Sequence, residues 1–203
     1  MQARWQPDPA DHEATFLDGI RTAAKAAARI VFLQELTLSR YLADERPANE
    51  PNALAEQLPG GPTHVFAAKA AAETRVTVHA SVFEKADGAD GPDGLGYNTA
   101  ILVAPDGTLL ARTRKLHIPK TAGYYEDHYF RPGPAAANPY PVIDYNDPLI
   151  SDPYGRVLVS APRDRDAVLI ADLDLDQRRD WLDRLPLLAT RRPDSYAALT
   201  QSD

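Results

Sequence analysis

The chain contains no cysteine among its 203 residues. That absence excludes disulfide bonds, zinc sites built on thiolates, and every mechanism in which a cysteine thiolate is the nucleophile. The sequence also has no apolar run long enough to span a bilayer, and its first residues, MQARWQPDPADHEA, lack the apolar core of a signal peptide. We therefore expect a cytoplasmic protein that makes no membrane contacts.

A surplus of positive charge is missing as well, because the formal net charge is −7. Nucleic acids and anionic lipids need a basic surface, so we expect neither as a partner. The glycine-rich segment ADGADGPDGLG has no Gly-Lys-Ser/Thr ending, and the chain has no Gly-x-Ser-x-Gly elbow. The five histidines show no recognised metal-ligand spacing, so we expect neither a metal nor a cofactor.

The composition is otherwise that of an ordinary folded protein. Hydrophobic residues make up 44% of the chain and charged residues 25%, and the length suits one domain with a sizeable core better than two. From Pro9 to Arg29 apolar residues recur at helical spacing, and the run Ile30–Leu33 that follows predicts a buried strand. A helix followed by a buried strand is typical of the α/β class.

Further along, short elements alternate with turns rich in proline and glycine. The pattern of residues 75–83 predicts a strand whose apolar face runs from Val76 to Val82. The sequence Ala104-Pro105-Asp106-Gly107 predicts a hairpin, because proline presets φ and glycine accepts a positive φ. The remaining expected elements are helices at residues 52–58, 63–73 and 175–185, strands at 97–103, 108–115 and 167–173, and a second hairpin over 148–160.

Three charged residues are candidates for chemistry. Glu35 follows the first strand, where α/β proteins place active sites, although a glutamate there can also begin a helix. Lys115 ends a strand and could stabilise an oxyanion, or it could be a solvated strand end beside two arginines. Glu126 lies among aromatic residues in GYYEDHYFRPG, where apolar surroundings would raise its pKa and suit an acid or base. The alternative for Glu126 is a loop carboxylate that faces water.

Taken together, several segments resemble the nitrilase superfamily of carbon–nitrogen hydrolases, most closely its N-carbamoyl amino acid and N-carbamoylputrescine amidases. In order and spacing they cover most of the chain. The segments are ARIVFLQELTLSRY (28–41), YNTAILVAPDGTLLARTRKLHIP (97–119), YEDHYFRPG (125–133), PYPVIDY (139–145), LISDPYGRVLVSAPRDRDAVLIADLDLDQRRDW (149–181) and RRPDSYAAL (191–199).

The resemblance implies an αββα sandwich that hydrolyses non-peptide carbon–nitrogen bonds in small amide or N-carbamoyl substrates, without a cofactor or metal. By motif it implies Glu35 as the base, Lys115 as the lysine and Glu126 as the second glutamate of the site. In such a site a cysteine thiol, activated by the base, attacks the carbonyl carbon, and the lysine stabilises the developing oxyanion.

One departure from the family pattern concerns the nucleophile. In the family, a segment like PVIDY leads into a strand that ends in the cysteine, whereas here Tyr145 leads into a segment that resembles a much later hairpin. We expect residues 1–203 to form a single, internally shortened domain with its junction near 145–149. Its fold would be an incomplete αββα sandwich that lacks central strands and helices. Neither Ser151 nor Ser160 has a base arranged to let it replace the thiol.

The first hypothesis is therefore a carbon–nitrogen hydrolase family member that is inactive as written. The alternative is a non-catalytic binding or assembly subunit that self-associates as a homo-oligomer, since lost core elements would expose apolar surface. A gene-level error or a deliberate deletion is a third explanation. We also expect low stability, because unpaired sheet edges would remain. Glu35 and Lys115 are expected to form a partly buried ion pair.

Overall fold

The computed structural model describes residues 1–86, 93–120, 122–134, 165–172 and 176. By its internal contacts the chain divides into two compact units, the first made of residues 1–144 and 161–170. Every helix and strand described below belongs to this first unit. The expected hairpin over 148–160 and the helix over 175–185 lie outside the described residues, apart from Asp176.

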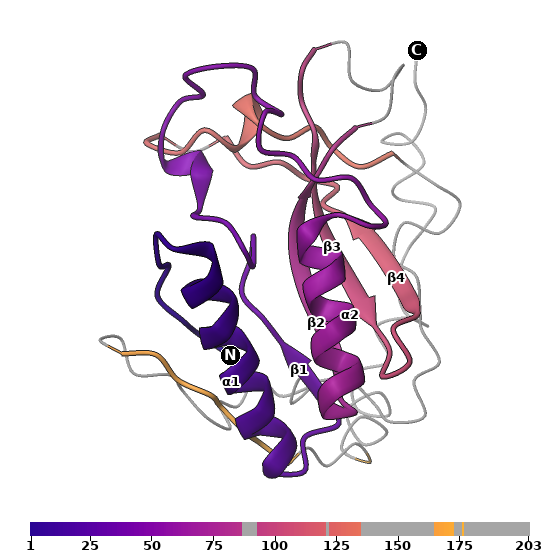
Figure 1. Ribbon diagram of the computed structural model, residues 1–203. Helices are drawn as coiled ribbons and strands as arrows, with labels where there is room; N and C mark the ends of the chain where they lie inside the picture. Colours follow the sequence, from indigo (N-terminus) through magenta and orange to yellow (C-terminus); the bar gives the residue numbers. More distant parts are fainter. Residues whose placement is uncertain (87–92, 121, 135–164, 173–175, 177–203) are drawn as a thin grey trace. The chain divides into compact units, whose positions relative to one another are not determined.

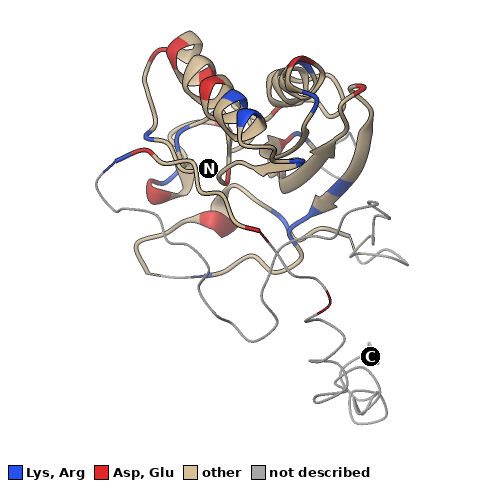
Figure 2. Ribbon diagram, turned by 90° about the horizontal axis from the view of Figure 1, so that it is seen from below, with Lys and Arg blue, Asp and Glu red and all other residues tan. Residues whose placement is uncertain are grey.

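The first helix, α1 (Pro9–Lys25), has clear start and stop signals. The Asp8 carboxylate caps it by accepting hydrogen bonds from the amides of Ala10 (2.8 Å) and Asp11 (3.1 Å). Acidic residues lie toward the start of α1 and basic residues toward its end, an arrangement that favours the helix dipole (Figure 2). The helix ends before the predicted Arg29, because the backbone turns left-handed at Ala27.

A four-stranded sheet follows, in the order β1-β2-β3-β4. Strand β1 (Ile30–Phe32) runs parallel to β2 (Thr77–Glu84), and β3 (Tyr97–Val103) and β4 (Leu109–Arg114) extend the sheet antiparallel. Gly107 has φ +86° in the turn between β3 and β4, so the predicted hairpin is confirmed. Because β1 and β4 point the same way, their carboxyl ends lie at the same edge of the sheet.

Helices α1 and α2 (Pro62–Thr74) cover one face of this sheet (Figure 1). Val76, which precedes β2, and the alternate β2 residues Val78, Ala80 and Val82 turn toward them, as the sequence pattern predicts. The mixture of a sheet and helices confirms the expected α/β class. The buried side chains of this core are Ala3, Phe16, Ile20, Ala23, Val31, Leu33, Phe66, Ala67, Ala70, Ala71, Val76, Val78, Ala80, Val82, Ile101 and Val103.

Two expected elements are wrong. Residues 52–58 form turns instead of a helix, because this stretch is short, lies between Pro51 and Pro59, and gives backbone hydrogen bonds to β2. The Glu56 amide donates to Phe83 and the Glu56 carbonyl accepts from Lys85. In the expected strand over 167–173, the described residues form only an isolated bridge between Ala167 and Gln2.

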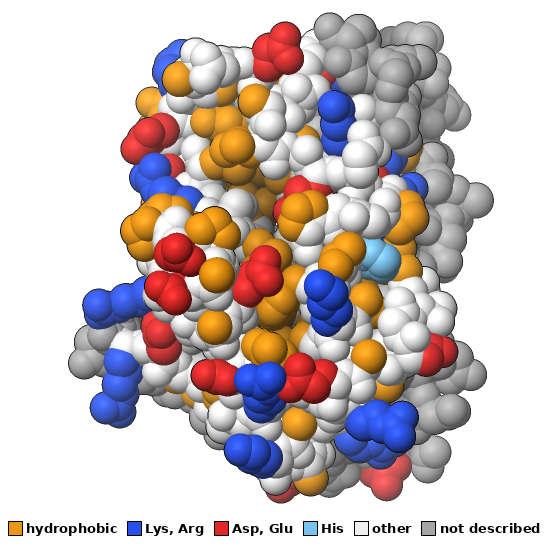
Figure 3. Space-filling model, viewed as in Figure 1, with side chains coloured by type: hydrophobic (Ala, Val, Ile, Leu, Met, Phe, Trp, Pro, Cys, Tyr) orange, Lys and Arg blue, Asp and Glu red, His pale blue; other side chains and the backbone are white. Residues whose placement is uncertain are grey.

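The helical face of the molecule carries a band of hydrophobic side chains with charged side chains on both sides (Figure 3). No helix in the described part of the chain combines the length and the apolar character needed to cross a membrane.

Candidate active site

Glu35 lies just beyond β1, in a tight turn. Leu36, the next residue, is 1% exposed and has φ +50°. The backbone directly after the glutamate is therefore in the left-handed region, which leucine rarely adopts. The interpretation of Glu35 as the start of a helix is therefore wrong. Its carboxylate is 46% exposed and accepts a hydrogen bond of 2.6 Å from Asn98 Nδ2.

Lys115 directly follows β4 and is tied to the sheet through its backbone. Its amide donates to the carbonyl of Asn98 (2.8 Å), and its carbonyl accepts from the amide of Gly133 (2.8 Å). The ammonium group lies 2.6 Å from Glu126 Oε2 and 3.6 Å from Glu35 Oε1. Lys115 is therefore a paired residue between two carboxylates, and not a freely solvated strand end.

Glu126 opens the short 3₁₀ helix η3 (Glu126–His128) and is only 6% exposed. Its two oxygens have different partners, because Oε2 accepts from Lys115 and Oε1 accepts from the hydroxyl of Tyr41 at 2.8 Å. The alternative of a loop glutamate that faces water is wrong. Tyr129 and Phe130 pack beside it in a second hydrophobic cluster, which fixes the position of η3.

The structure thus brings Glu35, Lys115 and Glu126 together, although they are far apart in the sequence. Burial alone would lower the pKa of Lys115, but its hydrogen bond to Glu126 and the negative charges of both glutamates outweigh burial and hold that pKa above its usual value. Lys115 therefore carries its positive charge at neutral pH. Burial, reinforced by the hydrogen bond to Glu126, also raises the pKa of Tyr41.

An open pocket of about 320 Å³ lies on the sheet face opposite the helices, beside Glu35 and Lys115. The strands supply small or polar side chains to it, so the sheet leaves room for a small molecule. Burial lowers the pKa of His79, one of these side chains. The lining residues are Glu35, His79, Ser81, Asn98, Ala100, Thr113 and Lys115.

Sequence reasoning missed two members of this site, Asn98 and Tyr41. Asn98 holds the Glu35 carboxylate with its side chain and the Lys115 amide with its carbonyl, so one residue is bonded to both. Tyr41 donates a hydrogen bond to Glu126 Oε1. The sequence offered two indications of these residues. Asn98 is a polar residue near the start of an otherwise apolar strand, and Tyr41 lies six residues after Glu35.

Chemically, the site combines an accessible carboxylate with a charged ammonium group. A carboxylate in this position can accept a proton, and a fixed ammonium group can stabilise negative charge on a substrate oxygen. Among the described residues, no group of three or more histidines, aspartates and glutamates is arranged to hold a metal ion. The sequence supplies no thiol to complete covalent catalysis.

Comparison with known proteins also points to hydrolysis of carbon–nitrogen bonds. A family model described as carbon–nitrogen hydrolase matches residues 1–149. The N-carbamoylputrescine amidase of Solanum lycopersicum is 35% identical over 133 residues, which cover 66% of this chain and 42% of that protein. The N-carbamoylputrescine amidase of Oryza sativa subsp. japonica is 37% identical over 114 residues, which cover 56% of this chain and 36% of that protein.

Among solved structures, the carbon–nitrogen hydrolase from Helicobacter pylori G27 matches with 27% identity and a TM-score of 0.56, over 66% of this chain and 43% of that chain. The chain therefore spans less than half the length of these relatives.

Proposed function

Since this chain belongs to the carbon–nitrogen hydrolase family, we propose that Glu35, Lys115 and Glu126 are the polar frame of its hydrolytic site, and that the chain alone does not turn over substrate. The observation that carries this proposal is Lys115, held between two carboxylates beside an open pocket in a chain without cysteine. The substrates that fit the frame are small amides and N-carbamoyl amines. The names of the two plant relatives support that substrate class.

Each residue has a role that follows from its surroundings. Glu35 is the general base, because its carboxylate is accessible and is oriented by Asn98. Lys115 stabilises the oxyanion, because it stays charged and lines the pocket. Glu126 keeps Lys115 charged and in place, and it is buried too deeply to be a general base for a substrate in the pocket.

The missing step is nucleophilic attack. Hydrolysis of an N-carbamoyl amine to the amine, carbon dioxide and ammonia consumes one water, and the family route passes through a carbamoyl group bonded to the cysteine sulfur. Without a thiol the nucleophile of the family is missing, and water and the pocket hydroxyls of Ser81 and Thr113 are far weaker nucleophiles. The internal junction near 145–149 lies outside the described residues, so it stays a prediction, as does the single shortened domain over 1–203. A cytoplasmic location is also a prediction.

An ammonia-release assay with N-carbamoyl amino acids, simple amides and nitriles tests this proposal. We expect no release above that of the Glu35→Ala variant for any of the three substrate classes. Clear turnover by the unaltered chain that disappears in Glu35→Ala would overturn the proposed inactivity, although it would keep the role of Glu35.

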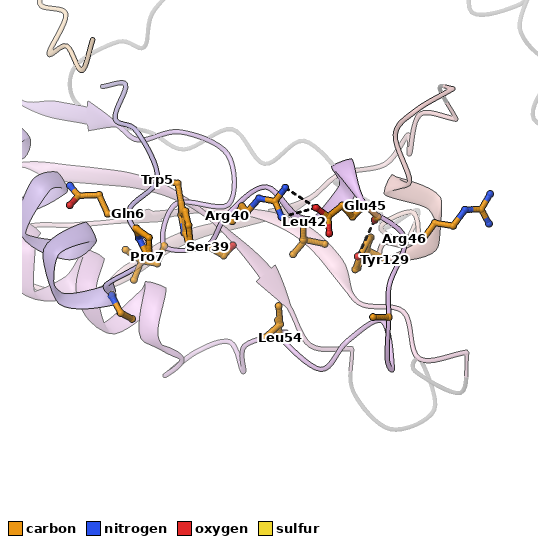
Figure 4. A pocket seen from close by; sticks show the side chains of 13 residues that line it. Trp5, Gln6, Pro7, Ser39, Arg40, Leu42, Glu45, Arg46, Leu54 and Tyr129 are labelled. Atoms are coloured by element: carbon orange, nitrogen blue, oxygen red, sulfur yellow. Dashed lines mark hydrogen bonds and ion pairs between the residues drawn. The ribbon is translucent and has the colours of Figure 1, made fainter. Parts of the chain in front are cut away.

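A second candidate function is assembly without catalysis, favoured by another pocket that shares no lining residue with the pocket beside Glu35. This pocket of about 420 Å³ is lined largely by apolar side chains, among them Trp5 and Leu54, which is 72% exposed (Figure 4). Arg40 lies across it, paired with Asp44 and Glu45. Light scattering that shows only a monomer, at all accessible concentrations, would count against an assembly role; a dimer dispersed by Leu54→Glu would support it.

A further inference from the structure

A buried ion-pair cluster lies on the sheet face that carries the helices, directly behind Lys115. Its centre is Glu84, the last residue of β2, which is only 2% exposed. The guanidinium group of Arg114 forms two hydrogen bonds with it, Nη2 to Oε1 at 2.5 Å and Nε to Oε2 at 3.0 Å. Thr99 donates a further hydrogen bond of 2.6 Å, and Arg112 lies 3.3 Å away.

Arg114 is held by more than this fork. Its guanidinium carbon lies 3.8 Å from the centre of the Tyr97 ring, a close cation–π contact with a buried aromatic side chain. Behind it the chain passes close by at Gly133, where a Cβ atom would lie 2.8 Å from Arg114 Cβ. The side chain of Arg114 therefore has one orientation, fixed by charge, by stacking and by packing.

The strand geometry transmits that orientation to Lys115. Successive side chains of a strand point to opposite faces, so a residue locked on one face determines where its neighbour leaves the other face. Arg114 points to the face of Glu84, and Lys115 points to the face of the pocket, where it meets Glu126 and Glu35.

We infer that Glu84 and Arg114 are positioning residues for Lys115: the pair clamps the end of β4 so that the lysine meets Glu126 at hydrogen-bond distance. This inference rests on the proposed role of Lys115 in the site. It assigns a function to a buried charged pair that otherwise contributes little net stability, since the cost of burying both ions offsets their attraction.

The pKa of Lys115 tests the inference without any turnover. The chain has only five lysines, so ¹³C-labelled lysine gives few signals, and a Lys115→Arg variant assigns the relevant one. The titration is compared in the unaltered chain, in Glu84→Gln and in Arg114→Leu. The matched control is Glu73→Gln, which removes a carboxylate paired with Arg21 on the helical surface.

Positioning and simple electrostatics predict opposite results for one variant. If Arg114 acts on Lys115 only through the electrostatic field of its positive charge, loss of that charge raises the pKa of Lys115. If the Glu84–Arg114 pair holds the lysine against Glu126, the same loss lowers that pKa. We expect a fall toward the usual value of 10.5 in both Glu84→Gln and Arg114→Leu, and no change in Glu73→Gln. A rise, or no change, in Arg114→Leu would overturn the inference.

A charge-conserving variant covers the case in which Arg114→Leu does not fold. Arg114→Lys keeps the charge but loses the two-pronged hydrogen bond to Glu84, so the field is unchanged and only the clamp weakens. A smaller fall in the pKa of Lys115 is expected, and an unchanged value contradicts positioning. Because no substrate is used, a contrary result for either Arg114 variant leaves the proposed hydrolytic site untouched. Absence of activity, in turn, does not affect the measurement of the pKa of Lys115.

Discussion

The hydroxyl of Tyr41 is a single group whose removal tests how Glu126 is held. It donates a hydrogen bond of 2.8 Å to Glu126 Oε1, and the carboxylate is 6% exposed, so water cannot easily replace the lost donor. A hydrogen bond to a charged group contributes about 1.5–3 kcal/mol to stability. Removal of the donor costs most when the acceptor stays buried without a partner. We therefore expect Tyr41→Phe to lower the free energy of unfolding by about 1.5–3 kcal/mol at pH 7.

Urea unfolding followed by circular dichroism measures this loss, and the melting temperature should fall by roughly 3–12 °C for a chain of this size. The matched control is Tyr124→Phe, the same chemical change at a side chain that is 54% exposed. It should be nearly neutral. If Tyr41→Phe is as stable as Tyr124→Phe, the Tyr41 hydroxyl does not hold Glu126, and the segment that follows β1 is not tied to the site through this contact.

Three further outcomes follow from the same contacts. Because the pKa values of Lys115 and Tyr41 lie above their usual 10.5 and 10.0, the folded chain holds these protons more tightly than the unfolded chain, so the free energy of unfolding should fall as the pH rises above about 10; urea unfolding between pH 8 and 11.5 measures this, and Tyr41→Phe should flatten the fall. Asn98→Asp places a second carboxylate against Glu35 and should cost about 1–3 kcal/mol at pH 7, measured by urea unfolding; a loss no larger than that of Asn98→Ala would rule out charge repulsion. Phe130→Ala removes a buried ring that packs edge-on against Phe83 (5.0 Å between ring centres) and should cost about 3–5 kcal/mol, measured by urea unfolding; a loss below 1 kcal/mol would mean that this cluster does not anchor η3.

Much of the site frame could be predicted because it depends on strand direction. Glu35 and Lys115 follow strands that run in parallel, and carboxyl ends of parallel strands meet at one edge of a sheet. Alternation in the strand sequences likewise predicted which residues of β2 enter the core. The expected proximity of Glu35 and Lys115 is thus confirmed. Glu126 joins them from a 3₁₀ helix, where only the motif resemblance placed it in the site, and the catalytic roles of all three stay a prediction.

The parts that could not be predicted depend on contacts between distant segments. Residues 52–58 pair with β2 through the Glu56 backbone, a tertiary contact that overrides local helix preference. The left-handed turn at Leu36 could not be predicted either, since leucine gives no local signal for a positive φ. Tyr41 and Asn98 each become part of the site only through a partner that the sequence alone does not place beside them.

The most direct test is to follow N-carbamoylputrescine, labelled with ¹³C at its ureido carbon, by NMR in the presence of the purified chain at high concentration. Without a thiol, the ureido signal should keep its intensity for days, and no labelled bicarbonate should appear beyond the rate in buffer. Bicarbonate that grows in proportion to the concentration of the chain, and that vanishes in Glu35→Ala, would show that this frame catalyses hydrolysis without a cysteine.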